Sequence, residues 1–82
     1  MPPTVSTLER VQLVVAAVLR VPVEQVEPHV PLYQVTELDS MHLAEIAAAL
    51  DEEFHVRLPS EGLEAVQTVE DLARLVEAAP QR

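Results

Sequence analysis

Asp39, Ser40 and His42 are the residues whose types and closeness in the chain suggest chemistry. A carboxylate, a hydroxyl and an imidazole can form a nucleophilic triad when the imidazole lies within hydrogen-bond reach of the hydroxyl. On a helix, however, residues two positions apart point about 200° away from each other. We therefore expect no catalytic residue, and we treat Ser40 as a hydroxyl at the start of a helix.

The remaining residues that could do chemistry form no second site. The three histidines, His29, His42 and His55, lack metal-ligand spacing, so we expect surface histidines and no metal. The two aromatic residues, Tyr33 and Phe54, are too far apart in the sequence to suggest a platform for stacking bases, and we interpret both as core anchors.

Ser40 must be positioned by the helix that follows it. One face of this helix is apolar at helical spacing, through Leu43, Ile46, Ala47, Leu50 and Phe54. Asp39 and Ser40 are both good N-cap types, and the next glycine or proline is Pro59. The pattern predicts an amphipathic helix of about four turns that begins at Asp39 or Ser40.

An earlier helix is predicted after Ser6. Ser6 and Glu9 have the spacing of a capping box, and apolar residues recur at helical intervals as Leu8, Val11, Val14, Val15, Val18 and Leu19. The many valines make a strand the rival interpretation. Because the spacing and the cap agree, we expect a helix that Pro22 stops.

A long loop is predicted for residues 21–35, where three prolines fall within ten residues. Loops of this length are functional or carry packing anchors. The candidate anchors here are Val23, Val26, Val30, Leu32 and Tyr33.

The last third of the chain predicts a connector and two more helices. Residues 55–59 alternate polar and apolar but show no pairing partner, so we expect an extended connector. Gly62 limits the next helix, which starts at Ser60, to two turns at most. Thr68 caps a clearer helix, which Pro80 ends.

The expected fold is therefore all-α: a small bundle of three main helices plus a short helix before the last, with a long loop between helices one and two. We expect one domain over residues 1–82, with a loose N-terminus at 1–5 and a tail at 80–82. The long loop leaves open whether the first two helices run parallel or antiparallel.

Composition narrows the function. A net charge of −9 excludes nucleic-acid binding, which needs a basic face, and points to basic protein partners. The chain has no cysteine, so thiol chemistry would need a borrowed thiol. Residues 11–18 form too short an apolar run to span a bilayer, so we expect a soluble, cytoplasmic chain that binds no membrane. We also expect a monomer.

The order of these features resembles the acyl carrier protein family. The resemblance rests on Leu38-Asp39-Ser40-Met41 at the helix start, together with the proline-rich loop before it. It extends to Leu50-Asp51-Glu52-Glu53-Phe54 at the helix end and to Thr68-Val69-Glu70-Asp71-Leu72 at the start of the last helix. It thus covers almost the whole chain.

The resemblance implies a non-catalytic carrier whose Ser40 receives 4′-phosphopantetheine from coenzyme A through a phosphopantetheinyl transferase. The arm's thiol would hold cargo as a thioester. Asp39 matches the aspartate before the family's serine and would support the site. Elementary electrostatics agrees, because a phosphodiester at a helix N-terminus meets free N–H groups and the positive end of the dipole.

The resemblance also implies that this helix recognises partner enzymes. The matching positions are Met41, His42, Ala44, Glu45, Ala48, Asp51 and Glu52. The expected partners beyond the transferase are an acyltransferase, a ketosynthase or an adenylating ligase with a basic docking patch.

Two alternatives remain at this stage. Within the carrier class, an aminoacyl or peptidyl carrier competes with an acyl carrier of polyketide or fatty acid type. In a different class, a helical interaction module without a prosthetic group would need only the acidic surface and the capped helices. One departure from the family is Thr36-Glu37-Leu38, where relatives usually have glycine three residues before the serine.

Overall fold

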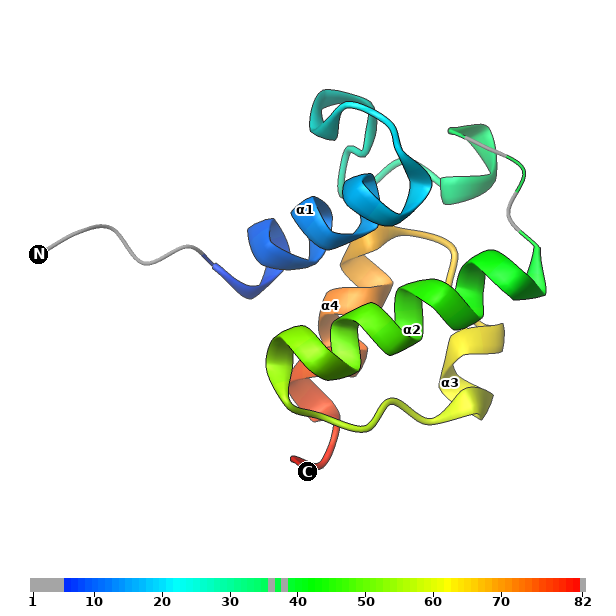
Figure 1. Cartoon of the computed structure of the whole chain (residues 1–82). Helices are drawn as coiled ribbons and strands as arrows, with labels where there is room; N and C mark the ends of the chain where they lie inside the picture. The colour runs from blue at the N-terminus through cyan, green and yellow to red at the C-terminus, as the bar shows by residue number, and fades with distance from the viewer. Residues whose placement is uncertain (1–5, 36, 38, 82) are drawn as a thin grey trace, which may run out of the picture.

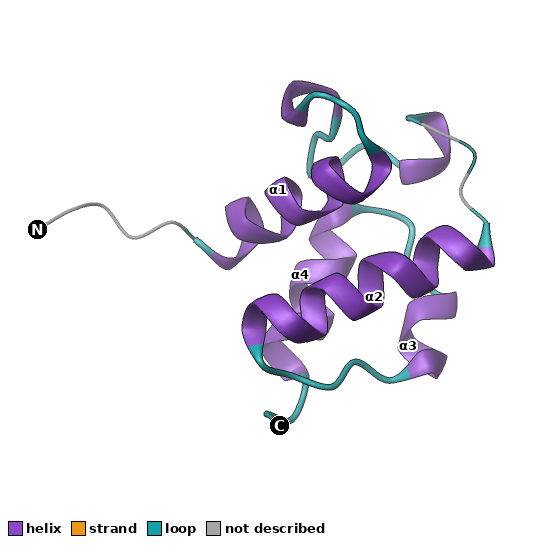
Figure 2. Cartoon of the chain, in the orientation of Figure 1, coloured by secondary structure: helices purple, strands orange, loops and turns teal. Residues whose placement is uncertain are grey.

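The computed structural model describes residues 6–35, 37 and 39–81, apart from the side chain of residue 60. Within these residues the chain forms four α-helices and no strand: α1 (Thr7–Leu19), α2 (Ser40–Phe54), α3 (Ser60–Glu64) and α4 (Val69–Ala78). Figures 1 and 2 show three longer helices with the short α3 before the last. The predicted all-α fold is confirmed.

The first helix begins where its cap predicts. The Ser6 hydroxyl accepts a hydrogen bond from the Glu9 N–H at 3.1 Å. Val11 and Val15 are fully buried, so the valines pack one face of a helix and the strand alternative is wrong. Tertiary burial of that face outweighs the low helix propensity of valine.

Helices α1 and α2 run antiparallel, which answers the question that the sequence left open (Figure 1). Arg10, near the start of α1, lies against the end of α2. Its guanidinium is 2.9 Å from the Glu53 carboxylate and 4.3 Å from the centroid of the Phe54 ring. Both contacts join the start of one helix to the end of the other.

The core lies where α1, α2 and α4 meet. Its largest fully buried side chains are Leu32, Ile46, Leu50, Leu72, Val11, Val15, Val26 and Val69. All are Leu, Ile or Val, as the scarcity of aromatic residues predicts. The two inward residues of α2 among them, Ile46 and Leu50, fix which faces of α2 remain outside.

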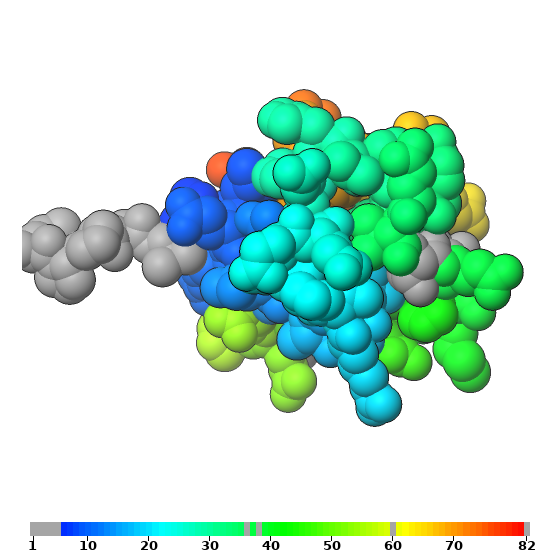
Figure 3. Space-filling view, turned by 90° about the horizontal axis from the view of Figure 1, so that it is seen from above, coloured from blue at the N-terminus to red at the C-terminus, as the bar shows by residue number. Residues whose placement is uncertain are grey.

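Several hydrogen bonds anchor the loop between α1 and α2 to the rest of the bundle. It contains two short 3₁₀ helices, η1 (Val23–Gln25) and η2 (Leu32–Gln34). The Gln12 side-chain amide donates to the Val26 carbonyl at 2.6 Å, and the Leu32 N–H donates to the Gln67 carbonyl at 2.7 Å. The loop therefore lies over the bundle, and Figure 3 shows it from above.

The aromatic residues behave differently from the prediction. Tyr33 is 64% exposed, so it is not a core anchor, because Leu32 before it takes the inward position of η2. Phe54 does pack against the core and is half-buried, with the Arg10 guanidinium over its ring.

His55, the first residue of the predicted connector, ends α2 in a left-handed conformation (φ 55°, ψ 48°) and is not extended. The connector pairs with the end of the chain from Val56 on. Val56 forms an isolated antiparallel bridge with Gln81, and the Arg57 N–H donates to the Pro80 carbonyl at 3.1 Å. This pairing turns Val56 and Leu58 inward, where both are buried. The sequence showed no partner because this pairing is long-range.

Gly62 of the short α3 lies against the Leu75 side chain of α4. A Cβ atom at Gly62 would lie 2.8 Å from Leu75 Cδ2, so a larger residue there would displace the end of the Leu75 side chain. The five-residue helix agrees with the predicted limit of two turns. Along the described part of the chain, no helix has the length and apolar character needed to cross a bilayer.

Replacing Arg20 by glycine is expected to stabilise the fold. Arg20 ends α1 with φ 59° and ψ 45°, a left-handed conformation that costs a residue with a side chain about 1 kcal/mol. Arg20→Gly should raise the free energy of unfolding in urea by up to about 1 kcal/mol. Ala17→Gly, at a regular helical position, should lower it by about 0.5–1 kcal/mol. Equal losses in both variants would contradict this account of Arg20.

Candidate functional site

Asp39, rather than Ser40, is the N-cap of α2. Its backbone is extended, with φ −108° and ψ 179°, and its Oδ1 accepts a hydrogen bond from the His42 N–H at 2.8 Å. The Leu43 N–H donates to the Asp39 carbonyl at 3.1 Å, which is the first bond of the helical ladder. Ser40 is therefore the first residue inside the helix.

The Asp39 carboxylate also faces the imidazole of His42. His42 Nδ1 lies 3.0 Å from Asp39 Oδ1, an ion pair when the ring is protonated, although the alignment is too poor for a hydrogen bond. The hydrogen bond from the His42 N–H, assisted by the charge of the imidazole, holds the pKa of the Asp39 carboxyl below its usual range. The imidazole is thus directed to Asp39 and supplies no base to Ser40.

The Ser40 side chain lies at the protein surface. Ser40 is exposed, and no described residue forms a side-chain hydrogen bond with it. Because Asp39 satisfies the His42 N–H, the cap does not use the serine oxygen. The backbone N–H groups of Ser40 and Met41 precede the first N–H of the helical ladder, and they lie at the positive end of the helix dipole.

A mostly apolar groove extends from Ser40 along α2 toward α3. Its lining comprises Ser40, Leu43, Ala44, Ala47, Ala48, Asp51, Leu58, Leu63 and Glu64. The small side chains of Ala44, Ala47 and Ala48 leave the groove open on the α2 side. Leu58 of the connector and Leu63 of α3 form the opposite wall. We call this the Ser40 groove.

The outer positions of α2 that the sequence predicted for partners divide into two groups. Met41 is 71% exposed, and Ala44, Glu45, Ala48 and Glu52 are also exposed. Asp51 is half-buried, and its Oδ1 accepts the Leu58 N–H at 3.0 Å. His42 is half-buried beside Asp39.

Sequence reasoning missed several residues of the site. Leu58 and Leu63 line the Ser40 groove, and Asp51 holds the connector that carries Leu58. The alternation of residues 55–59 was the available signal, because apolar residues at alternating positions of an extended segment tend to share one face. The departure from the family lies just before the site: Glu37 is exposed, while Thr36 and Leu38 fall outside the described residues.

No other chemical centre emerges from the described residues. They contain no group of three histidine, cysteine or carboxylate side chains arranged to hold a metal ion. His29 pairs with Glu70 of α4, its Nδ1 lying 3.2 Å from the carboxylate, so this histidine ties the first loop to α4.

Comparison of the sequence with known proteins finds a matching family and several relatives. Residues 9–76 match the protein family described as "Phosphopantetheine attachment site". The chain is 33% identical to an acyl carrier protein of Helicobacter hepaticus over 73 residues, 89% of this chain and 96% of that protein. It is 38% identical to an acyl carrier protein of Thermosynechococcus vestitus over 65 residues, 79% of this chain and 80% of that protein.

Replacing Asp39 by asparagine is expected to reduce the acid sensitivity of the fold. Since the folded-state pKa is lowered, the carboxylate stabilises α2 fully above its unfolded pKa, and this contribution is lost as the pH falls through the folded value. Asparagine keeps a capping oxygen but does not titrate near acid pH. Between about pH 6 and about pH 2, Asp39→Asn should therefore lose less unfolding free energy than wild type.

Urea unfolding followed by circular dichroism at each pH measures the difference. Asp71→Asn provides a control, because hydrogen bonds from the Gln67 and Thr68 N–H groups lower the pKa of Asp71 at the start of α4. Asp71→Asn should also lose less unfolding free energy at low pH than wild type, and its effect should be independent of the effect of Asp39→Asn. Parallel pH profiles for wild type and Asp39→Asn would contradict the role given to Asp39.

Proposed function

Since the chain belongs to the acyl carrier protein family, we propose that Ser40 carries its prosthetic group and that α2 presents the loaded chain to partner enzymes. Proteins of this family are carriers rather than enzymes, and their prosthetic group is 4′-phosphopantetheine. The group supplies the thiol that this cysteine-free chain lacks and holds cargo as a thioester. Family membership thus decides against an interaction module without a prosthetic group.

The exposed side chain of Ser40 is the observation that carries this proposal. It lies in the first turn of α2, where the backbone N–H groups that precede the helical ladder and the positive end of the dipole favour a phosphodiester. Asp39 caps α2 through its own side-chain oxygen, so attachment of phosphopantetheine to the Ser40 oxygen would break no capping hydrogen bond. The residues present therefore fit the group.

Loading with coenzyme A tests the attachment site. After incubation with coenzyme A, Mg²⁺ and a promiscuous phosphopantetheinyl transferase, wild-type protein should gain the mass of one phosphopantetheine. Ser40→Ala should gain none, because the accepting oxygen is missing. Intact mass spectrometry measures both.

Ser60→Ala is the matched control, because Ser60 also opens a helix, α3. This variant should be modified like wild type. An equal mass gain in Ser40→Ala, or no gain in wild type, would contradict attachment at Ser40.

The Ser40 groove supports an acyl cargo of polyketide or fatty acid type. Leu43, Leu58 and Leu63 give it apolar walls, which favour methylene groups over the charged amine of an aminoacyl group. We propose that an acyl chain attached through Ser40 folds back into this groove. An aminoacyl or peptidyl cargo is the less favoured alternative.

Chain length tests the cargo. Protein loaded with straight acyl chains of increasing length should show a melting temperature that rises with length, because each buried methylene contributes up to about 0.8 kcal/mol. In Ala48→Phe, an exposed position that lines the groove, the ring should occupy the space and remove the rise. Aminoacyl loading should give no comparable stabilisation.

Ala17→Phe serves as the control, since it places the same ring on an exposed position of α1 away from this groove. Its length dependence should match wild type. A melting temperature that is independent of chain length in wild type would overturn the cargo assignment.

The exposed outer positions of α2 support docking of basic partners. Met41 beside Ser40 offers an apolar contact, and Glu45 and Glu52 offer carboxylates along the same helix. We propose that the transferase, and an acyltransferase or ketosynthase, approach through this face of a monomeric, cytoplasmic carrier. Asp51 contributes less directly, because its carboxylate holds the connector.

A further inference from the structure

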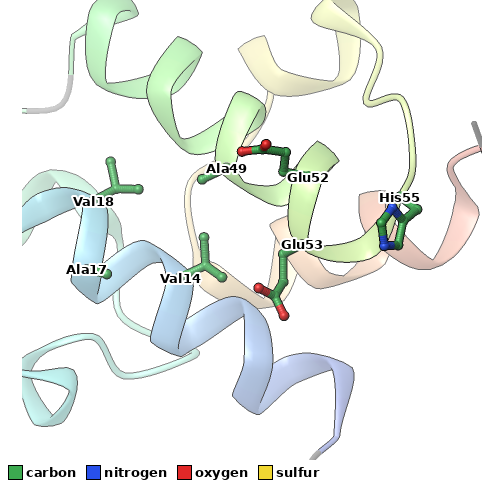
Figure 4. Close-up of a pocket in the computed structure, with 7 residues that line it drawn as sticks. All are labelled: Val14, Ala17, Val18, Ala49, Glu52, Glu53 and His55. Atoms are coloured by element: carbon green, nitrogen blue, oxygen red, sulfur yellow. The ribbon is translucent and has the colours of Figure 1, made fainter.

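A second groove lies between α1 and α2 and shares no residue with the Ser40 groove. Val14 and Val18 project from α1 toward α2, and Ala17 and Ala49 leave space between the helices (Figure 4). Its volume is about 440 Å³. We call it the α1–α2 groove.

The apolar floor of the α1–α2 groove continues along α1. A neighbouring hollow shares Val14, Ala17 and Glu53 with it and adds Arg10 and Leu13. Leu13 is 54% exposed and is one of the exposed large hydrophobic residues of the chain. Together the two hollows form a continuous strip of aliphatic surface that nothing in the described residues covers.

Two carboxylates, the Arg10 guanidinium and the exposed imidazole of His55 border the strip. The Glu53 carboxylate is balanced by Arg10 at 2.9 Å. Glu52 is exposed on the groove's α2 side and has no ion-pair or hydrogen-bond partner among the described residues. The groove therefore combines an apolar floor with one carboxylate that is free to pair with an incoming cation.

We propose that the α1–α2 groove binds a basic amphipathic helix of a partner protein. The aliphatic side chains of the partner helix would pack over Ala17 and Ala49, and a lysine or arginine of the partner helix would pair with Glu52. A second copy of this chain fits poorly, because each copy carries a net charge of −9 and would place like charges together. This docking surface shares Glu52 with the partner face proposed above, but its apolar contacts come from α1 and Ala49, so it requires neither Ser40 nor the prosthetic group.

A pair of synthetic helical peptides provides the test. One peptide presents leucines beside lysines, and the other has the same leucines with glutamate for every lysine. Added to the isotope-labelled full chain, the basic peptide should shift the amide signals of Val14, Ala17, Val18 and Ala49. The acidic peptide should leave them unchanged, and Ser40→Ala protein should respond like wild type.

Single substitutions then locate the contact. Glu52→Arg should weaken binding of the basic peptide about five- to tenfold. Ala17→Gln, which fills the groove from an exposed position, should weaken it to a similar degree. As matched controls, Glu61→Arg on α3 and Ala78→Gln at the end of α4 change exposed residues outside the groove and should alter the affinity less than twofold.

Three results would overturn the proposal. The first is signal shifts confined to the α2–α3 side of the molecule. The second is equal weakening by Glu52→Arg and Glu61→Arg, which would indicate attraction by net charge alone. The third is a concentration-dependent dimer of the free chain that buries the same groove signals, which would make a second copy the occupant.

Discussion

The hydrogen bond from the His42 N–H to Asp39 Oδ1 is the constraint on which the rest of the site depends. It makes Asp39 the cap, so α2 begins at Ser40 and the serine oxygen is left without a structural task. Burial of Ile46 and Leu50 in the core then keeps the start of α2, with Ser40, on the surface. Because Asp39 caps the helix through its own oxygen, the attachment that we propose at Ser40 would not compete with folding for the serine oxygen.

Small side chains on α2 explain how a thin core still leaves two grooves. Ala48 lines the groove on the α3 side, and Ala49 lines the groove on the α1 side. Larger residues at these positions would fill the space that separates α2 from its neighbours. The same helix therefore packs through one face and lines a groove on each of two others, for which we propose cargo and a partner helix.

The sequence predicted the elements well because their signals are local. The caps at Ser6 and Thr68 and the apolar spacing of residues 8–19 and 43–54 each lie within one element. The choice between Asp39 and Ser40 as cap was beyond the sequence, since both types cap well and only the extended backbone of Asp39 decides. The chemistry of Ser40 came from the order of motifs along the chain.

What the sequence missed depends on contacts between distant segments. The direction of α2 against α1 follows from packing that includes the Arg10 contacts with Glu53 and Phe54. Tyr33 was wrongly expected inside, because residue type alone does not say which of two adjacent apolar residues of a short turn faces the core. The connector's bridge to Gln81, and hence the wall that Leu58 gives the Ser40 groove, is also long-range.

The central claim is that Asp39 caps α2 independently of what happens at Ser40. Following the Asp39 carboxyl carbon by NMR through an acid titration, in the unmodified protein and after loading with phosphopantetheine, tests it most directly. We predict a pKa below the usual aspartate range in both forms, with the His42 amide proton protected in both. An ordinary aspartate pKa in the unmodified protein, or loss of His42 amide protection after loading, would contradict the account.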